Sequence, residues 1–267
     1  MRSETVTDHW VNHPEGRIFA RQWHPPVKTV AAPIIMLHDS LGCTELWRGF
    51  PAALCTAASR RVIAYDRLGF GQSDARTGKP SLDFVVEEAA RYFPAVREQM
   101  GIDRFAVLGH SVGGGMSIQI AARMPEACDA LITIAAQVFA EDRTLAGIAA
   151  AKQQFTDPRQ VERLSKYHGK KSRWVLDAWI DNWLDPEFRA WTLAGVLPQV
   201  RCPALVIHGE LDEYGSAVHP KTIERLCGGP TRVELLEGRG HVPFREQPVD
   251  IALRVSTFLE TSQRPID

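Results

Sequence analysis

The segment that most constrains the fold of this chain is Gly109-His110-Ser111-Val112-Gly113. It stands between an apolar run, RFAVLGH, and a stretch with helical spacing that begins near Val112. In such a tight strand-to-helix turn a serine adopts a strained backbone that lifts its hydroxyl clear of the sheet, and glycines two residues away on either side avoid clashes. The helix start also offers free backbone N–H groups to a developing negative charge. The segment therefore predicts a strand-turn-helix unit with Ser111 as a candidate nucleophile.

The flanking sequence alternates short apolar runs, rich in β-branched residues, with longer amphipathic stretches. We expect strands at Ile18–Trp23, Pro33–His38, Arg61–Asp66, Phe105–His110, Ala130–Ala135, Ala204–His208 and Arg232–Leu236. Helices are expected at Glu45–Ala58, Leu82–Met100, Val112–Met124, His219–Leu226 and Pro248–Glu260. This alternation is typical of an α/β fold, and it predicts a doubly wound, mostly parallel β-sheet.

The interval 137–200 breaks the alternation because it contains no clean strand, yet it holds four of the seven tryptophans. It is too long for a simple crossover, so we expect a helical cap insertion over the active edge of the sheet. The predicted core is then 1–136 together with 201–267. Trp174, Trp179 and Trp183 are candidate substrate-binding residues of the cap. The alternative is an ordinary helical layer whose aromatic residues only pack.

Charge and cysteine content limit the classes of partner and cofactor that we expect. The 31 basic and 32 acidic residues nearly cancel, which argues against nucleic acid and favours a small-molecule substrate. The five cysteines are odd in number and scattered, so neither a disulfide framework nor a zinc site is indicated, and no other metal or cofactor is expected. The first residues lack an apolar run and no later run could span a bilayer, so we expect a cytoplasmic protein without membrane contact.

A serine hydroxyl is a poor nucleophile at neutral pH and needs a base, which in turn needs an orienting acid. We predict that His241 is the base, because it lies after the last expected strand in a turn that flanking glycines and a proline should keep exposed. The acid should lie between serine and histidine in sequence, at the end of a strand, and Asp212 meets both conditions. Three other carboxylates stay open as alternatives, namely Glu210, Glu213 and Asp142.

Three further histidines receive structural interpretations. His110 is expected to point away from the reaction centre, while His208 should pack within its strand and His38 should support its loop. The Asp66–Gly71 turn lacks both the G-x-G-x-x-G pattern and a Walker lysine, so it is interpreted as a structural turn.

The order Ser, Asp, His and the segments GHSVGG, YDRLGFGQS, HGELD and GRGHVPF resemble the α/β-hydrolase superfamily, in its capped esterase, lactonase and C–C-hydrolase branch. The resemblance extends from about Ile34 to about Leu259. It implies an oxyanion hole formed by the backbone N–H of Val112 and by that of Ser40. The chain departs from the pattern at Asp39, which replaces a glycine. Its carboxylate could accept a backbone N–H, face the pocket or only cap the following segment.

The function implied is that of a serine hydrolase that cleaves a carboxylic ester through an acyl-enzyme. A serine at this turn argues against the haloalkane-dehalogenase and epoxide-hydrolase branches, which use aspartate there. Two alternatives stay open. One is a C–C bond hydrolase or a lyase of the same fold, and the other is a non-catalytic ligand-binding homologue.

The densest basic stretch, 167–173, precedes the tryptophan-bearing part of the interval. We hypothesise that Lys170, Lys171 and Arg173 attract an anionic or carrier-linked ester at the pocket rim. The alternative is a solvated basic face that aids solubility.

Overall fold

The computed structural model describes residues 5–262 and contains one eight-stranded sheet in the order β1-β2-β4-β3-β5-β6-β7-β8. The strands are β1 (Thr5–Val11), β2 (Ile18–His24), β3 (Ile34–Leu37), β4 (Val62–Tyr65), β5 (Phe105–His110), β6 (Cys128–Ile134), β7 (Ala204–Gly209) and β8 (Thr231–Leu236). Strands β3 to β8 pair in parallel, whereas β1 and β2 join the β4 edge in antiparallel fashion. The predicted α/β class with a mostly parallel sheet is confirmed.

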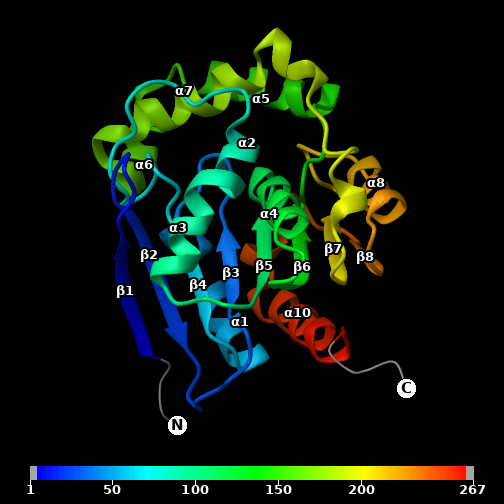
Figure 1. Ribbon diagram of the computed structural model, residues 1–267. Helices are drawn as coiled ribbons and strands as arrows, with labels where there is room; N and C mark the ends of the chain where they lie inside the picture. Colours follow the sequence, from blue (N-terminus) through cyan, green and yellow to red (C-terminus); the bar gives the residue numbers. More distant parts are fainter. Residues whose placement is uncertain (1–4, 263–267) are drawn as a thin grey trace.

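Helices cover both faces of this sheet (Figure 1). One face carries α1 (Phe50–Ala58) and α10 (Pro248–Ser262). The other carries α2 (Phe84–Glu87), η2 (Glu88–Tyr92), α3 (Phe93–Gln99), α4 (Val112–Arg123) and α8 (Val218–Leu226). The doubly wound layout follows from this arrangement.

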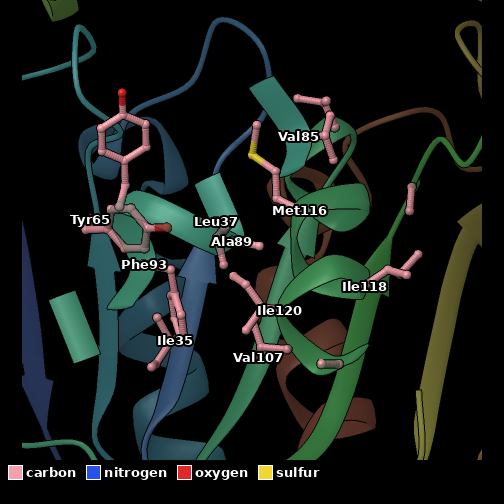
Figure 2. Packing of buried hydrophobic residues seen from close by; sticks show 14 of the residues in the cluster. Ile35, Leu37, Tyr65, Val85, Ala89, Phe93, Val107, Met116, Ile118 and Ile120 are labelled. Atoms are coloured by element: carbon pink, nitrogen blue, oxygen red, sulfur yellow. The ribbon is translucent and has the colours of Figure 1, made fainter. Parts of the chain in front are cut away.

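Alternate residues of the same strand point to opposite faces of the sheet. In β3, Ile34 and Met36 belong to the cluster under α1 and α10, while Ile35 and Leu37 belong to the cluster under α3 and α4. Figure 2 shows Ile35 and Leu37 among side chains from α3 and α4. Because both faces of these strands are buried, the sheet is a rigid platform for the turns at its carboxyl ends.

The segment between β6 and β7 is helical. It contains α5 (Asp142–Gln154), α6 (Pro158–His168), η3 (Gly169–Lys171), α7 (Ser172–Trp183), η4 (Pro186–Ala190) and η5 (Leu197–Gln199). Figure 1 shows α5, α6 and α7 together at one end of the molecule, beyond the carboxyl ends of β3 and β5. Helices therefore lie where the sequence predicts a cap, and the division into domains at 136/137 and 200/201 stays a prediction.

The structure differs from the expected elements at three places. Strand β1 is not predicted, because an edge strand pairs through its backbone and six of its seven residues are at least partly exposed. The helix expected at Glu45–Ala58 divides into η1 (Thr44–Trp47) and α1, since Arg48 between them has a φ of 56°. The helix expected at Leu82–Met100 contains the π-helical turn η2 just before Pro94, a residue that cannot donate a helical hydrogen bond.

Within residues 5–262, none of the helices combines the length and the apolar character that crossing a membrane would require. All five cysteines are free thiols, and four of them are buried.

Candidate active site

Ser111 lies on the turn between β5 and α4, with φ 56° and ψ −126°. Such a conformation is strained for a residue with a side chain and persists only where the surroundings enforce it. A Cβ on Gly109 would lie 2.1 Å from the Gly113 carbonyl oxygen, and one on Gly113 would lie 2.3 Å from the Leu37 carbonyl oxygen. The two glycines are thus needed for close packing, and they let the turn hold Ser111 at the carboxyl edge.

The imidazole of His241 is hydrogen-bonded to Asp212. Its Nδ1 lies 2.9 Å from each carboxylate oxygen of Asp212, so Nδ1 carries the proton and donates. Asp212 follows β7 and also accepts the backbone N–H groups of Tyr214 at 2.8 Å and Gly215 at 3.0 Å. Burial raises the pKa of the Asp212 carboxyl, but the hydrogen bond and charge of His241 outweigh it and hold the pKa below its usual value. Asp212 is therefore the ionised partner that fixes the ring.

None of the other three candidate carboxylates is hydrogen-bonded to the His241 imidazole. Asp142 is at the start of α5, where its side chain is 85% exposed and pairs with Arg189 at 2.6 Å. Glu213 accepts the backbone N–H of His241 at 3.3 Å, and Glu210 accepts that of Gly238 at 3.4 Å. Of the four candidates, Asp212 is the one bonded to the imidazole.

The expectation that His241 lies in an exposed turn is wrong, because the residue is only 8% exposed. The Tyr214 ring lies 5.0 Å from its ring and the His110 ring 4.9 Å, measured between centroids. Both rings contribute to the burial of the imidazole.

His110 does not point away from the reaction centre, as the sequence suggested, but lines the same cavity as Ser111 and His241. Its Nε2 donates to the His241 carbonyl oxygen at 2.9 Å, and its Nδ1 lies 3.1 Å from Asp39 Oδ2. These two acceptors, from separate loops, turn the ring inward.

Asp39 combines two of the roles that the sequence left open. Its Oδ1 accepts the Leu41 backbone N–H at 2.9 Å, which caps the turn, and its Oδ2 faces His110. Burial raises the pKa of the Asp39 carboxyl. The hydrogen bond and charge of His110 lower this pKa by more, so that it lies well below its usual range. His38 supports this loop by donating from Nδ1 to the Asp39 carbonyl at 2.8 Å.

Ser111 and His241 open into one cavity of about 530 Å³, including its mouth, between the sheet edge and the cap. Ser40, Trp179 and Trp183 also line it. Val112 is the first residue of α4, where backbone N–H groups have no acceptor within the helix. The cavity has the size and mixed lining of a small-molecule site.

Ser111 itself is 5% exposed, and its hydroxyl donates to Gln137 Oε1 at 3.0 Å rather than to His241. Sequence reasoning missed Gln137 and five further lining residues, namely Leu41, Thr144, Ile148, Tyr214 and Val242. Gln137 could have been found, since it follows the carboxyl end of β6, next to the strand that ends at Ser111. Among the described residues, no His, Cys, Asp and Glu side chains form a group of three that could hold a metal ion.

Trp174 lies outside this cavity, so its predicted substrate contact is wrong. On α7, Trp179 and Trp183 are four residues apart and share one face, whereas Trp174 lies about 140° around the helix from Trp179. The Trp174 indole instead donates to the Gly78 carbonyl at 2.7 Å and packs edge-on against Phe70. It therefore holds the cap to the turn after β4.

The basic stretch before α7 also does not lie on the cavity. Lys171 points inward, and its Nζ donates to the carbonyls of Gly71 at 2.7 Å and of Phe70 and Ser73. Arg173 pairs with Asp177 at 2.9 Å on the exposed side of α7. Lys171 thus joins the helical segment to the core and is not free to meet an anion at the rim, and the attraction of an anionic ester by Lys170 stays a prediction.

Residues 32–192 match the family model described as alpha/beta hydrolase fold, which is more than half of the chain. The chain therefore belongs to the α/β-hydrolase fold family. An uncharacterized protein of Mycobacterium tuberculosis is 26% identical over 266 residues, covering 86% of this chain and 76% of that protein.

Solved structures of the same fold cover nearly the whole chain. The proline iminopeptidase of Mycobacterium smegmatis has a TM-score of 0.74 at 21% identity, covering 96% of this chain and 98% of that one. A bacterial membrane phospholipase A has a TM-score of 0.77 at 20% identity, covering 97% of this chain and 87% of that one. At these identities the likeness establishes the fold.

Proposed function

We propose that this protein is a serine hydrolase that cleaves a carboxylic ester of a small molecule. The observation that carries the proposal is the Asp212–His241 pair, 2.9 Å apart, opening into the same cavity as a serine on a strained strand-to-helix turn. Because Nδ1–H of His241 donates to the Asp212 carboxylate, Nε2 of His241 is left as the basic nitrogen. A hydrolase also agrees with the peptidase and phospholipase among the proteins that share the fold.

The reaction proceeds in two steps. Ser111 turns its hydroxyl from Gln137 towards His241, transfers the proton to Nε2 and forms a bond from Oγ to the ester carbonyl carbon. His241 returns that proton to the leaving alcohol as the ester C–O bond breaks. A water molecule, deprotonated by the same nitrogen, then attacks the acyl-enzyme, and the acid leaves as Ser111 regains its proton.

In both steps the carbonyl oxygen becomes negatively charged and needs hydrogen-bond donors. We assign this role to the backbone N–H groups of Val112 and Ser40. The Val112 group lies at the positive end of the α4 dipole. The Ser40 loop is held by Asp39 and His38 through the contacts described above, so its backbone is positioned before substrate binds.

The acyl group would lie against Trp179 and Trp183, which form the cap side of the cavity. No residue of the proposed reaction calls for a cofactor or metal. Replacing Trp179 by Ala should therefore raise kcat/KM for bulky acyl groups relative to acetyl, whereas Trp174→Ala, the matched control outside the cavity, should leave that ratio within about twofold. Equal ratios in both variants would contradict the assignment of the acyl pocket.

Product analysis separates ester hydrolysis from the alternatives. An ester releases an alcohol and an acid, a peptide-like amide releases an amine, and C–C cleavage releases two carbonyl-derived fragments. We expect turnover of a panel of short methyl and aryl esters and none of the amides of the same acids. Turnover of amides or vinylogous diketones alone would favour the peptidase or C–C hydrolase reaction, and binding without turnover would favour the ligand-binding homologue.

A further inference from the structure

A second chamber adjoins the catalytic cavity. It shares Ser40, Trp179 and Trp183 with that cavity, and it has a volume of about 440 Å³ including its opening. Its opposite wall contains two arginines, Arg67 and Arg76, neither of which any proposed step of ester cleavage uses. The two cavities therefore share a wall formed by Ser40, Trp179 and Trp183, and they differ in the chemistry of their remaining lining.

Arg67 is a buried cation without an ion pair. The residue is 6% exposed, and no carboxylate oxygen of the described chain lies within 4.0 Å of its guanidinium. Its Nη2 donates to the Asp39 carbonyl at 2.9 Å, and the guanidinium carbon lies 4.1 Å from the Phe70 ring centroid. Within residues 5–262 its Nε finds no hydrogen-bond partner. A guanidinium stays charged in proteins, and burying one unpaired is costly.

The other charged groups that line the chamber are Arg76 and Glu88. Arg76 Nη2 pairs with Glu87 at 2.9 Å, and its guanidinium keeps further N–H groups. Glu88 accepts the Tyr65 hydroxyl at 2.7 Å, and burial raises the pKa of the Glu88 carboxyl. Glu88 is thus occupied by Tyr65 and does not form an ion pair with Arg67. The charge of Arg67 lowers the pKa of Glu88, but no carboxylate oxygen of the described chain directly contacts the Arg67 guanidinium.

We propose that this chamber binds the free carboxylate at the far end of an acyl chain, so that the substrates are monoesters of dicarboxylic acids. A carboxylate matches the planar guanidinium in shape and charge, and it would supply the acceptor that Arg67 Nε lacks. The ester carbonyl would lie at Ser111, and the chain would pass Ser40 between Trp179 and Trp183. Hydrolysis would release an alcohol and a dicarboxylate. This inference depends on the proposed ester hydrolysis and names its substrate class.

The test compares each monomethyl dicarboxylate, from succinate to suberate, with the methyl alkanoate of equal acyl length. At the preferred length, wild type should show kcat/KM about tenfold to a hundredfold higher for the charged ester, the value of one or two charge-assisted hydrogen bonds. Arg76→Gln should remove most of this preference, measured as the ratio of kcat/KM for the charged ester to that for the neutral ester. Arg173→Gln, the control, exchanges an ion-paired arginine outside both cavities and should keep the preference.

Direct binding gives a readout independent of turnover. Ser111→Ala should bind glutarate or its best homologue by calorimetry, and adding Arg76→Gln or Arg67→Met should weaken that binding at least tenfold with folding checked by circular dichroism. Equal kcat/KM for charged and neutral esters, together with no dicarboxylate binding, would overturn the chamber assignment while leaving ester hydrolysis intact. Absence of turnover for every ester would count against the proposed function. Calorimetry would then still show whether the chamber binds a dicarboxylate.

Discussion

His241 and His110 both line the catalytic cavity and each faces an aspartate, but their hydrogen bonds give the two pairs different capacities. In the pair Asp212–His241, the carboxylate bonds to Nδ1 and no described residue bonds to Nε2. In the pair Asp39–His110, the carboxylate faces Nδ1 at 3.1 Å and Nε2 already donates to the His241 carbonyl. The distances are similar, but only His241 keeps a nitrogen with which to exchange a proton with Ser111 and a substrate.

The second pair therefore acts as a support for the first. His110 connects the loop of Asp39, which carries Ser40, to the loop of His241. Such a contact fixes the relative position of two loops without taking part in bond making.

The largest expected effect is that of His241→Ala. It should lower kcat by about a millionfold, as should Ser111→Ala, because nucleophile and base act as a unit. Because the His241 imidazole also donates to the buried Asp212 carboxylate, the midpoint of thermal unfolding should fall, while circular dichroism should still show the native fold. Steady-state hydrolysis of the best ester measures the loss.

His110→Ala provides the matched comparison for that variant. It should cost no more than about a hundredfold in kcat, since it loosens His241 without removing the base. Equal losses for the two histidines would break the distinction between a catalytic and a supporting pair.

Asp212→Asn should have the next largest effect, a drop in kcat of about 10³- to 10⁴-fold. An amide at this position cannot fix the Nδ1–H tautomer or stabilise the imidazolium that forms during attack. Asp142→Asn is the control, because Asp142 is exposed and pairs with Arg189. A large effect at Asp142 with none at Asp212 would show that Asp142 is the acid that orients His241.

Asp39→Ala should affect stability more than chemistry. Loss of its contacts to Leu41 and His110 should lower the free energy of unfolding by about 1 to 3 kcal/mol, as for hydrogen bonds to a charged group. We expect kcat to fall about tenfold, through a looser Ser40 loop. Urea unfolding and steady-state kinetics measure the two effects, and a kcat loss as large as that of Asp212→Asn would contradict the supporting role.

The smallest effect is a pH dependence of stability. The pKa of Asp212 is lowered in the folded state, so its contribution is complete above the pKa of an unfolded aspartate, about 3.9, and is lost as the pH falls through the lower folded value. The stability gap between wild type and Asp212→Asn should stay constant from pH 7 to about pH 5 and narrow below about pH 4. Urea midpoints at several pH values test this, and a gap that widens in acid would contradict it.

The two pairs also differ in how far the sequence could predict them. Ser111, Asp212 and His241 could be proposed because their motifs are local: a glycine-bounded turn and two loops that directly follow strands. The contact between His110 and Asp39 joins residues 71 positions apart, and nothing in either local sequence specifies it. Long-range contacts of this kind depend on how the loops meet after the sheet has formed.

The same contrast separates the sheet from the cap. Strands buried on both faces give continuous apolar runs that predict their positions closely, as β5 does at Phe105–His110. In the cap, tryptophan content predicted a lid, but only the rotation of α7 decides that Trp179 enters the cavity and Trp174 does not. Arg67 was interpreted as part of a structural turn, because burial of its guanidinium is a property of the folded chain.

The central claim is that Ser111 is the nucleophile, and covalent labelling tests it most directly. Wild type, Ser111→Ala and Gln137→Ala should be incubated with a fluorophosphonate and analysed by intact mass and peptide mapping. We predict one adduct per chain in wild type, located on Ser111, none in Ser111→Ala, and labelling retained in Gln137→Ala, which frees the Ser111 hydroxyl from its acceptor. An adduct on a different residue, or equal labelling of wild type and Ser111→Ala, would contradict the assignment of the nucleophile.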